Sequence, residues 1–255
     1  MKQTMGIVGL GAFGRFMARH VSARFDVRGW DRETPSPEML KADRAETITL
    51  SSFEDVCSAD VVVFAVPLDG LAEVAGRAAS FLKPDALAAD VTSVKVKPVA
   101  ILRETLPEHV DILGTHPLFG PQSGRDGIAG LRIALCPVRI SSERYYRVCD
   151  WLTRDLRLLV LRVTEEEHDR EMAKVQAVTH FMSRALKEVG LEPSLMATKA
   201  YEKLQEFSAI VLSDSWDLFL TIQNGNPYAA GMRRKLMDEM RKLETALARD
   251  NGGTA

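Results

Sequence analysis

Three glycines near the start of the chain have the spacing of a phosphate-binding turn. The apolar residues Met5–Val8 lead directly into Gly9-x-Gly11-x-x-Gly14, and apolar residues recur at helical spacing after it. In such a strand–turn–helix unit, the glycines permit a tight turn, a close backbone approach to a pyrophosphate and close packing of the helix on the strand. The first turn of the helix offers unpaired N–H groups to phosphates. The pattern predicts a dinucleotide site that includes Gly9, Gly11, Ala12, Phe13 and Gly14.

An acidic residue follows the second expected strand, where the ribose of such a dinucleotide would lie. Asp31 comes about 20 residues after the glycines, a distance at which a carboxylate can bond the ribose 2′-hydroxyl. Its charge would repel a 2′-phosphate and favours NAD, whereas Arg32 can attract that phosphate, so NADP stays the alternative. Val66, Pro67 and Thr92 follow later strands and are expected to line the cofactor as well.

His116 is the candidate for proton transfer. It follows an expected strand, and ligands of parallel sheets bind at the carboxyl ends of strands, so we expect it at the rim of the cofactor crevice. Imidazole titrates near neutrality and can accept a proton at physiological pH. Ser93, at the end of another strand, can orient the same reacting group or can cap the following helix. Lys95 is either a cation beside them or a solvated loop residue.

A second polar group is expected on a long helix in the C-terminal half. Gln176 and His180 are one turn apart and share a face with Thr179. Such a patch can form a wall of a substrate site, or it can be a buried histidine at a domain interface. The remaining histidines are expected at the surface: His20, His109 and His168.

The composition is that of an ordinary globular protein. The chain has 255 residues, 46% of them hydrophobic and 27% charged, with a net charge of −2. This balance gives no general attraction to nucleic acid or to membranes, and no apolar run approaches the ~18 residues that span a bilayer. Cys57, Cys136 and Cys149 lie far apart, which fits core positions in a reducing compartment rather than disulfides or a metal site. We expect a cytoplasmic protein without a signal peptide or a bound metal.

Strands and helices should alternate over the first part of the chain. This alternation predicts a Rossmann-type, mainly parallel sheet covered by helices on both faces, within a dinucleotide-binding domain of residues 1–163. The expected strands are Met5–Val8, Val27–Trp30, Val61–Ala65, Ala86–Asp90, Asp111–Gly114 and Ile133–Cys136.

Residues 164–255 should form an all-α domain for substrate binding and dimerisation. Thr164 and Glu167 have the spacing of a capping box, and the helix that they open should end at Gly190. Further helices are expected over residues 194–222 and 227–247, and the tail 250–255 is expected to fray.

Several segments together resemble the prephenate/arogenate dehydrogenases of tyrosine biosynthesis. They are DVTSVK at 90–95, THPLFGPQSG at 115–124, EHD at 167–169 and QAVTH at 176–180. The C-terminal half is most similar to the plant-type arogenate branch, on TKAYE at 198–202, SDSWDL at 213–218 and NP at 226–227. The resemblance covers nearly the whole chain.

The resemblance implies an oxidative decarboxylation that depends on NAD or NADP. Hydride would leave ring carbon C4 of arogenate or prephenate, His116 would accept the proton of the C4 hydroxyl, and Ser93 would orient that hydroxyl. The products would be tyrosine or 4-hydroxyphenylpyruvate. The positions that match the substrate pocket of the family are Gln176, Thr179, His180, Thr198, Lys199 and Asp214, in addition to Ser93 and His116.

The chain departs from the bacterial prephenate-type pattern at Ala209, where that pattern has an arginine for the substrate carboxylate. Asp214 would favour the ammonium group of arogenate over the keto group of prephenate, or it is a helix-surface residue. The cations that can replace the arginine are Lys95, Lys199 and Arg125, or Arg233 and Arg234 of a second subunit.

Two other functions fit the layout. One is a two-domain dehydrogenase of the β-hydroxyacid or imine-reducing type, which would need a lysine such as Lys174 on the long helix. The other is a non-enzymatic dinucleotide sensor, although a DNA-bound sensor should carry a basic patch that this sequence lacks. The apolar residues of the C-terminal helices indicate a homodimer, as the resemblance also implies.

Overall fold

The computed structural model describes residues 2–251, so most of the expected frayed tail lies outside the described residues. The chain forms two compact units, Met1–His168 and Asp169–Ala255. The first unit has an eight-stranded sheet of order β3-β2-β1-β4-β5-β6-β7-β8. Every pair is parallel except β6 with β7. The strands are β1 Gln3–Val8, β2 Phe25–Trp30, β3 Thr49–Leu50, β4 Val61–Phe64, β5 Leu87–Asp90, β6 Asp111–Pro117, β7 Arg132–Arg139 and β8 Leu159–Arg162.

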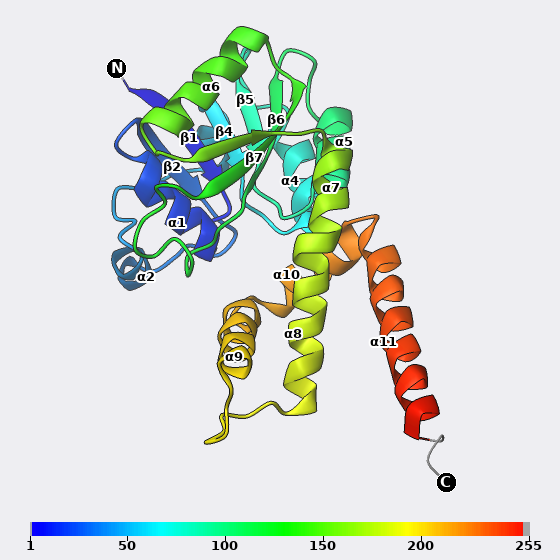
Figure 1. The fold of residues 1–255 in the computed structure, drawn as a ribbon. Helices are drawn as coiled ribbons and strands as arrows, with labels where there is room; N and C mark the ends of the chain where they lie inside the picture. Colours follow the sequence, from blue (N-terminus) through cyan, green and yellow to red (C-terminus); the bar gives the residue numbers. More distant parts are fainter. Residues whose placement is uncertain (1, 252–255) are drawn as a thin grey trace. The chain divides into compact units, whose positions relative to one another are not determined.

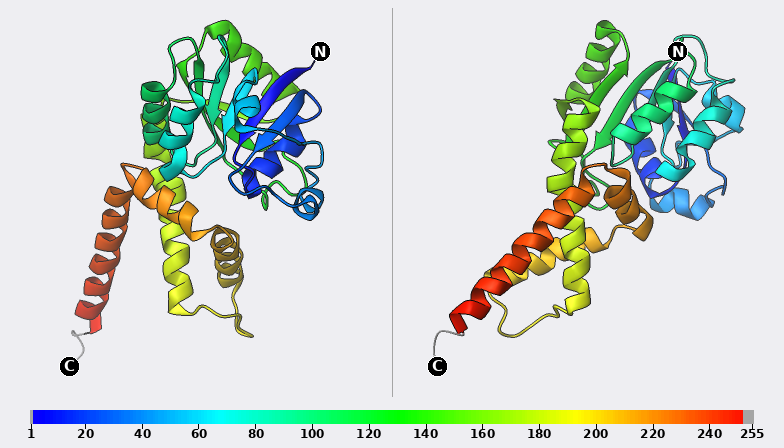
Figure 2. Two further views of the ribbon diagram at one scale, coloured as in Figure 1. Left: turned by 180° about the vertical axis from the view of Figure 1, so that it is seen from behind. Right: turned by 90° about the vertical axis from the view of Figure 1, so that its right-hand side faces the viewer.

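Helices cover both faces of this sheet, which confirms the Rossmann-type prediction. Figure 1 shows α1 (Ala12–Val21) and α6 (Ser142–Arg154) in front of the sheet, and Figure 2 shows α4 (Leu68–Ala78) and α5 (Val96–Thr105) behind it. Side chains that alternate along a strand serve the two faces, so Ile112 packs in the core under α4 and α5 while Leu113 packs under α1 and α6. The short helices α2 Pro37–Ala42 and α3 Phe53–Cys57 complete the unit.

Two strands of the sheet were not expected from the sequence. β3 has two exposed residues, too few for a periodic signal, and β8 is a mostly exposed edge strand. Cys57 and Cys136 are buried and Cys149 is half-buried, which agrees with the core positions expected for them. Burial raises the pKa of the Cys57 thiol to about 12, which makes it a core residue rather than a nucleophile.

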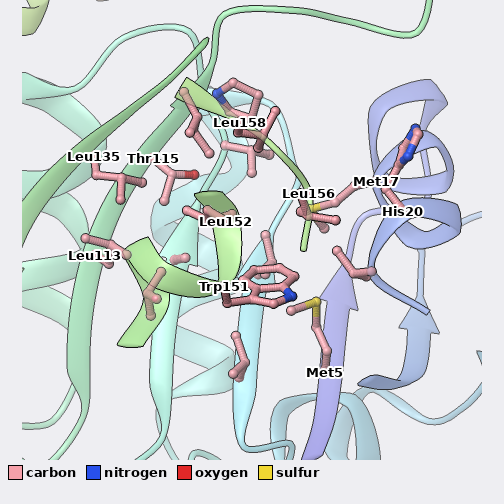
Figure 3. Close-up of a pocket in the computed structure, with 18 of the residues that line it drawn as sticks. Met5, Met17, His20, Leu113, Thr115, Leu135, Trp151, Leu152, Leu156 and Leu158 are labelled. Atoms are coloured by element: carbon pink, nitrogen blue, oxygen red, sulfur yellow. The ribbon is translucent and has the colours of Figure 1, made fainter. Parts of the chain in front are cut away.

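An apolar cavity of about 130 Å³ lies between the sheet and the helices α1 and α6. Figure 3 shows Trp151 and Leu152 over the strands, with Met17 and His20 at the side of α1. The ring of His20, expected at the surface, packs edge-on against Phe16 at 4.9 Å between centroids. The cavity is a packing feature of the core and does not coincide with the glycine turn.

The second unit is helical, as expected, but its helices are interrupted. The capping box, near the end of the first unit, is formed, because Thr164 Oγ1 accepts from the Glu167 N–H (3.2 Å) and the Glu167 carboxylate accepts from the Thr164 N–H (2.8 Å). The helix that follows ends at Gly190, whose φ of +78° suits glycine. The helical segments from residue 165 onward are α7 Glu165–Met172, which begins in the first unit, the π-helical η1 Ala173–Ala177, α8 Val178–Val189, α9 Lys199–Leu212, α10 Trp216–Leu220, the π-helical η2 Thr221–Gly225 and α11 Ala229–Asn251.

The helical region expected over residues 194–222 is present from Lys199 on, but it is divided into α9, α10 and η2. The chain turns at Ser213 and Asp214, and Ser215 starts α10 by accepting a hydrogen bond from the Leu218 N–H at 3.1 Å. The apolar periodicity continues across this turn, so it hid the serine cap. No helix of residues 2–251 is long and apolar enough to cross a membrane.

Candidate active site

The glycine turn has the geometry that a bound pyrophosphate needs. Gly9 adopts φ +103°, and a Cβ there would clash with the carbonyl of Ala65. A Cβ on Gly14 would fall on the carbonyl oxygen of Gly9, so this residue must be glycine for α1 to approach β1. A Cβ on Gly11, in contrast, would meet no atom within 4 Å. The space in front of Gly11, at the N-terminus of α1, is where the backbone can receive an anion.

Asp31 is held against this turn. Its carboxylate accepts hydrogen bonds from the Leu10 N–H (2.6 Å) and the Glu33 N–H (3.1 Å), which fixes it just after β2. Arg32 beside it is exposed. The carboxylate is therefore presented at the carboxyl end of β2, next to the expected phosphate position.

The remaining predicted cofactor residues follow neighbouring strands at the same edge. β1 lies between β2 and β4, the point where the strand order reverses, and this is where ligands bind in open α/β sheets. Val66 and Pro67 follow β4, and a Cβ on Gly9 would lie 3.1 Å from Val66 Cγ1. Thr92 follows β5, but its hydroxyl donates its one hydrogen either to the Asp90 carboxylate (2.5 Å) or to the Val94 carbonyl (2.8 Å).

His116 is buried and paired with another histidine. It occupies the end of β6, is 4% exposed, and its Nδ1 lies 2.8 Å from Nε2 of His168. One of these two nitrogens must carry the hydrogen. Burial, together with the neighbouring His168 and the charge of Lys95, lowers the pKa of His116 well below its usual value, so the ring is neutral at pH 7.

His168 is the residue whose role was missed. It was expected at the surface of a helix start, but it is 3% exposed and contacts the candidate base. The capping box directly before it fixes the first turn of α7, and this turn directs His168 toward β6. Its place in the EHD segment was the one available signal.

Lys95 is a structural residue, not a free cation. Its side chain is fully buried, and Nζ bonds to the carboxylate of Asp90 and to the carbonyl of Thr115 (2.5 Å). These bonds tie the segment after β5 to the strand that carries His116. Ser93 lies in this segment, and it does not cap α5, whose N-cap is Lys95.

In the second unit, the structure brings His180 and Asp214 together. His180 Nε2 lies 3.6 Å from Asp214 Oδ2. Burial, aided by the charge of Arg184, lowers the pKa of His180 to about 4, so the ring is neutral at pH 7 and forms no ion pair with the carboxylate. Burial raises the pKa of Asp214, while Arg184 opposes that shift.

Gln176 and Thr179 lie beside the π-helical turn η1. Gln176 Oε1 is buried and has no hydrogen-bond partner among residues 2–251. Thr179 donates to the carbonyls of Val175 (2.8 Å) or Gln176 (2.9 Å). π-Helical turns inside α-helices are frequent at functional sites, and an unpaired amide oxygen here suits a ligand contact.

Thr198 and Lys199 lie at the start of α9, whereas Asp214 follows its end. α8 and α9 pack as an antiparallel pair (Figure 1). At 1.5 Å per residue, the length of α9 separates Thr198 and Lys199 from Asp214 by about 20 Å. Thr198 caps α9 by accepting from the Tyr201 N–H (3.2 Å), and Lys199 pairs with Glu202 (2.8 Å). The structure does not bring these two residues to His180.

The other proposed cations are also engaged or exposed. Arg233 donates to the carbonyl and the side chain of Gln223 at 2.8 and 2.7 Å. Arg125 pairs with Asp126 on the surface. A positive charge that acts on Asp214 belongs instead to Arg184, which the sequence patterns did not single out.

The chain is similar to known dehydrogenases. Family models described as "Prephenate dehydrogenase, nucleotide-binding domain" and "TYRAAT1-like, C-terminal domain" match residues 15–137 and 185–254. Two chloroplastic enzymes of Arabidopsis thaliana are similar over most of the chain. Arogenate dehydrogenase 2 is 33% identical over 91% of this chain and 66% of its own length, and arogenate dehydrogenase 1 is 30% identical over 95% and 39%. The chain thus spans less than two thirds of either relative.

A solved structure has the same fold. Prephenate dehydrogenase from A. aeolicus, in complex with hydroxyphenyl propionate and NAD+, superposes with a TM-score of 0.76 at 21% identity, covering 99% of this chain and 93% of that one. This likeness supports the Rossmann-type sheet and the helical unit that follows it.

Proposed function

Because the chain belongs to the prephenate/arogenate dehydrogenase family, we propose that it catalyses the NAD(P)-dependent oxidative decarboxylation of arogenate, prephenate or both. The observation that carries the proposal is the buried pair of His116 and His168, 2.8 Å apart at the carboxyl end of β6. It places a neutral imidazole at the edge of the sheet where a nicotinamide cofactor would bind.

The residues around the glycine turn fit a dinucleotide. The open space at Gly11 admits a pyrophosphate, and the fixed carboxylate of Asp31 suits a ribose hydroxyl. Gly9, Ala12, Phe13, Gly14, Val66 and Pro67 complete this proposed site, with Thr92 as a backbone contact because its hydroxyl is engaged. A nicotinamide cofactor held there would supply the hydride acceptor for C4 of the substrate.

His116 handles the proton of the C4 hydroxyl. For this, Nδ1–H of His116 donates to Nε2 of His168, which leaves Nε2 of His116 with a free electron pair for the hydroxyl. As hydride leaves, His116 accepts the hydroxyl proton or a strong hydrogen bond from it. The electrons of the bond to the ring carboxylate then make the ring aromatic, carbon dioxide leaves, and the phenol oxygen keeps or regains the proton.

Ser93 orients the hydroxyl beside His116. It lies in the segment that Lys95 ties to the Thr115 carbonyl, so its position relative to His116 is fixed by a buried bond. Because the Lys95 ammonium group is engaged by Asp90 and the Thr115 carbonyl, Lys95 positions the segment that carries Ser93 and does not bind the substrate carboxylate.

The test is a kinetic matrix of two substrates and two cofactors with wild type and His116→Asn. We expect the variant to bind NAD normally and to lose about 10²-fold in turnover, the scale of a general base. Full turnover in the variant would remove His116 as the base, and no turnover with either substrate in wild type would remove the proposed reaction. A cofactor-binding chain without turnover is the outcome expected of a dinucleotide sensor.

Arogenate is the substrate that we expect to be preferred. Asp214 is half-buried beside His180, and a carboxylate there attracts the ammonium of arogenate but not the keto group of prephenate. Asp214→Asn should therefore shift the ratio of kcat/KM values toward prephenate, and an unchanged ratio would contradict this role.

NAD is the expected cofactor. Asp31 occupies the position of the ribose hydroxyl partner and repels a 2′-phosphate. Asp31→Ser should narrow the preference for NAD over NADP; equal preference in wild type would contradict the assignment. We also place the protein in the cytoplasm, which cell fractionation can test.

We propose a homodimer formed through the second unit. Its helices expose large apolar side chains, among them Met182, Ile210, Trp216, Met240, Leu243 and Leu247.

The alternative of a β-hydroxyacid or imine-reducing dehydrogenase has less support, because Lys174 is exposed and pairs with Glu171 at 3.0 Å.

A further inference from the structure

Arg184 is a charged residue that the proposed reaction does not yet use. It lies on α8 one turn after His180, and its Nη2 donates to the main-chain oxygen of Asp214 at 2.8 Å. Its guanidinium lies 5.4 Å from the ring centroid of Trp216 and 5.5 Å from that of Phe219. These contacts hold the side chain in one place at the turn between α9 and α10.

Part of this guanidinium lacks a hydrogen-bond partner. Nε of Arg184 is inaccessible to solvent and bonds to no residue of the described chain. A buried unpaired N–H of a charged group is costly. Nearby, Nδ1 of His180 is also buried without a described partner.

A carboxylate lies beside this cation, but the hydrogen bond of the cation goes to a backbone oxygen. The hydrogen bond from Arg184 goes to the backbone oxygen of Asp214, and the Asp214 carboxylate points to the neutral His180 ring. The site thus presents a positive and a negative group side by side. That is the complement of an α-amino-acid group, whose carboxylate and ammonium are joined through one carbon atom.

We propose that Arg184 binds the carboxylate of the substrate's amino-acid side chain while Asp214 binds its ammonium. The inference rests on the proposed function and identifies the cation that the sequence left open. Four of the other candidates have partners: Lys95 pairs with Asp90, Lys199 with Glu202, Arg125 with Asp126, and Arg233 bonds to Gln223. A guanidinium can form two parallel bonds to a carboxylate, which a lysine cannot.

Three small molecules with one shared phenol ring test the pair by calorimetry on the full chain with NAD present. L-Tyrosine carries both charges, 3-(4-hydroxyphenyl)propionate carries only the carboxylate, and tyramine carries only the ammonium. Arg184→Gln should weaken the binding of L-tyrosine and of the propionate by roughly 10-fold or more and leave the affinity for tyramine unchanged. Asp214→Asn should weaken the binding of L-tyrosine and of tyramine and leave the affinity for the propionate unchanged.

Two further variants separate recognition from folding. Arg184→Lys keeps the charge, so it should retain part of the affinity for the propionate even if Arg184→Gln folds poorly. Lys187→Gln removes an exposed charge from the last turn of the same helix and should change none of the three affinities. Equal weakening of all three probes by both Arg184 variants would make the residue structural and overturn the proposal, as would a wild-type chain that binds none of them.

The binding test of Arg184 and the turnover test of the proposed function can fail separately. If the probe pattern holds but neither substrate is turned over, the amino-acid subsite stands and the dehydrogenase assignment fails. If both substrates are turned over but the probe pattern is absent, Arg184 loses its role and the dehydrogenase assignment stands.

Discussion

The hydrogen between the rings of His116 and His168 decides which nitrogen of His116 can act as a base. With the hydrogen on Nδ1 of His116, the lone pair of Nε2 is free for the substrate; in the opposite arrangement His116 Nε2 is a donor. Both rings are buried, so water cannot replace His168 in this role. A second histidine at this place therefore positions the base without touching the reacting atoms.

His168→Phe should lower kcat by roughly 10-fold or more while leaving the KM for the cofactor unchanged, because Nδ1–H of His116 loses its acceptor and the tautomers mix. His168→Gln offers an amide oxygen as acceptor and should recover part of the rate. Steady-state kinetics of the two variants provide the measurement. Identical losses in both, or an unchanged rate in His168→Phe, would contradict the tautomer argument.

His180 should make the protein sensitive to acid. Its pKa is about 4 in the folded chain and about 6.5 when unfolded, so the unfolded state takes up the proton first as pH falls. Its contribution to stability is lost progressively between these values, by about 2 kcal/mol at pH 5. Asp214 opposes this trend because its pKa is raised.

Urea unfolding at pH 7 and pH 5 can isolate the histidine. His180→Gln should lose less stability than wild type on going to pH 5, since the amide does not titrate. His109→Gln, at an exposed histidine, is the control and should follow wild type. If His180→Gln also follows wild type, the ring does not titrate as its burial demands.

At the scale of the elements, the turn between β1 and α1 contains two glycines with different roles: Gly14 is needed for packing, and Gly11 faces the proposed ligand. A Cβ on Gly14 would fall on the Gly9 carbonyl, whereas a Cβ on Gly11 would enter open space. Gly14→Ala should therefore destabilise the fold by about 1–3 kcal/mol. Gly11→Ala should have the melting temperature of wild type but bind NAD roughly 10-fold or more weakly, because the methyl group occupies the place of the pyrophosphate.

Thermal unfolding with and without NAD, together with titration of NAD, distinguishes the two alanine variants. The assignment of the turn fails if Gly11→Ala binds NAD as tightly as wild type does. It also fails if Gly14→Ala is as stable as wild type.

The sequence predicted elements whose signal is local. The buried strand β1, its glycine turn and the Thr164 capping box each depend on neighbouring residues, and each is present. The signals that failed depend on partners far away in the chain. His168 became a buried residue through a contact with β6, and Lys95 became one through Asp90 and Thr115. Arg184 matters because a turn that the apolar pattern concealed brings Asp214 to it.

At the scale of the whole molecule, the two units differ in how much apolar surface they bury. The first unit has three extensive buried clusters on the two faces of its sheet. The second has a small one, formed by Ala177, Ile222 and Ala229, with Leu218 packed against it. A helical unit with so little core needs further apolar contacts to remain folded, which is the physical reason to expect a second copy of the chain.

The long helix α11 offers a surface for such a contact. Leu236, Met240, Leu243 and Leu247 follow one another at intervals of four, three and four residues, the spacing of a helix–helix seam, and Leu243 is 66% exposed.

We expect a dimer by light scattering, and a melting temperature of the helical signal that rises with protein concentration. Leu243→Lys should shift the chain toward monomer and lower that temperature, because a charge in the seam cannot be buried unpaired. Glu244→Lys places the same charge one residue away, on a different face of α11, and should leave the dimer intact. A monomeric wild type would contradict the proposed dimer. Equal effects of the two lysine substitutions would contradict the assignment of the interface to this face of α11.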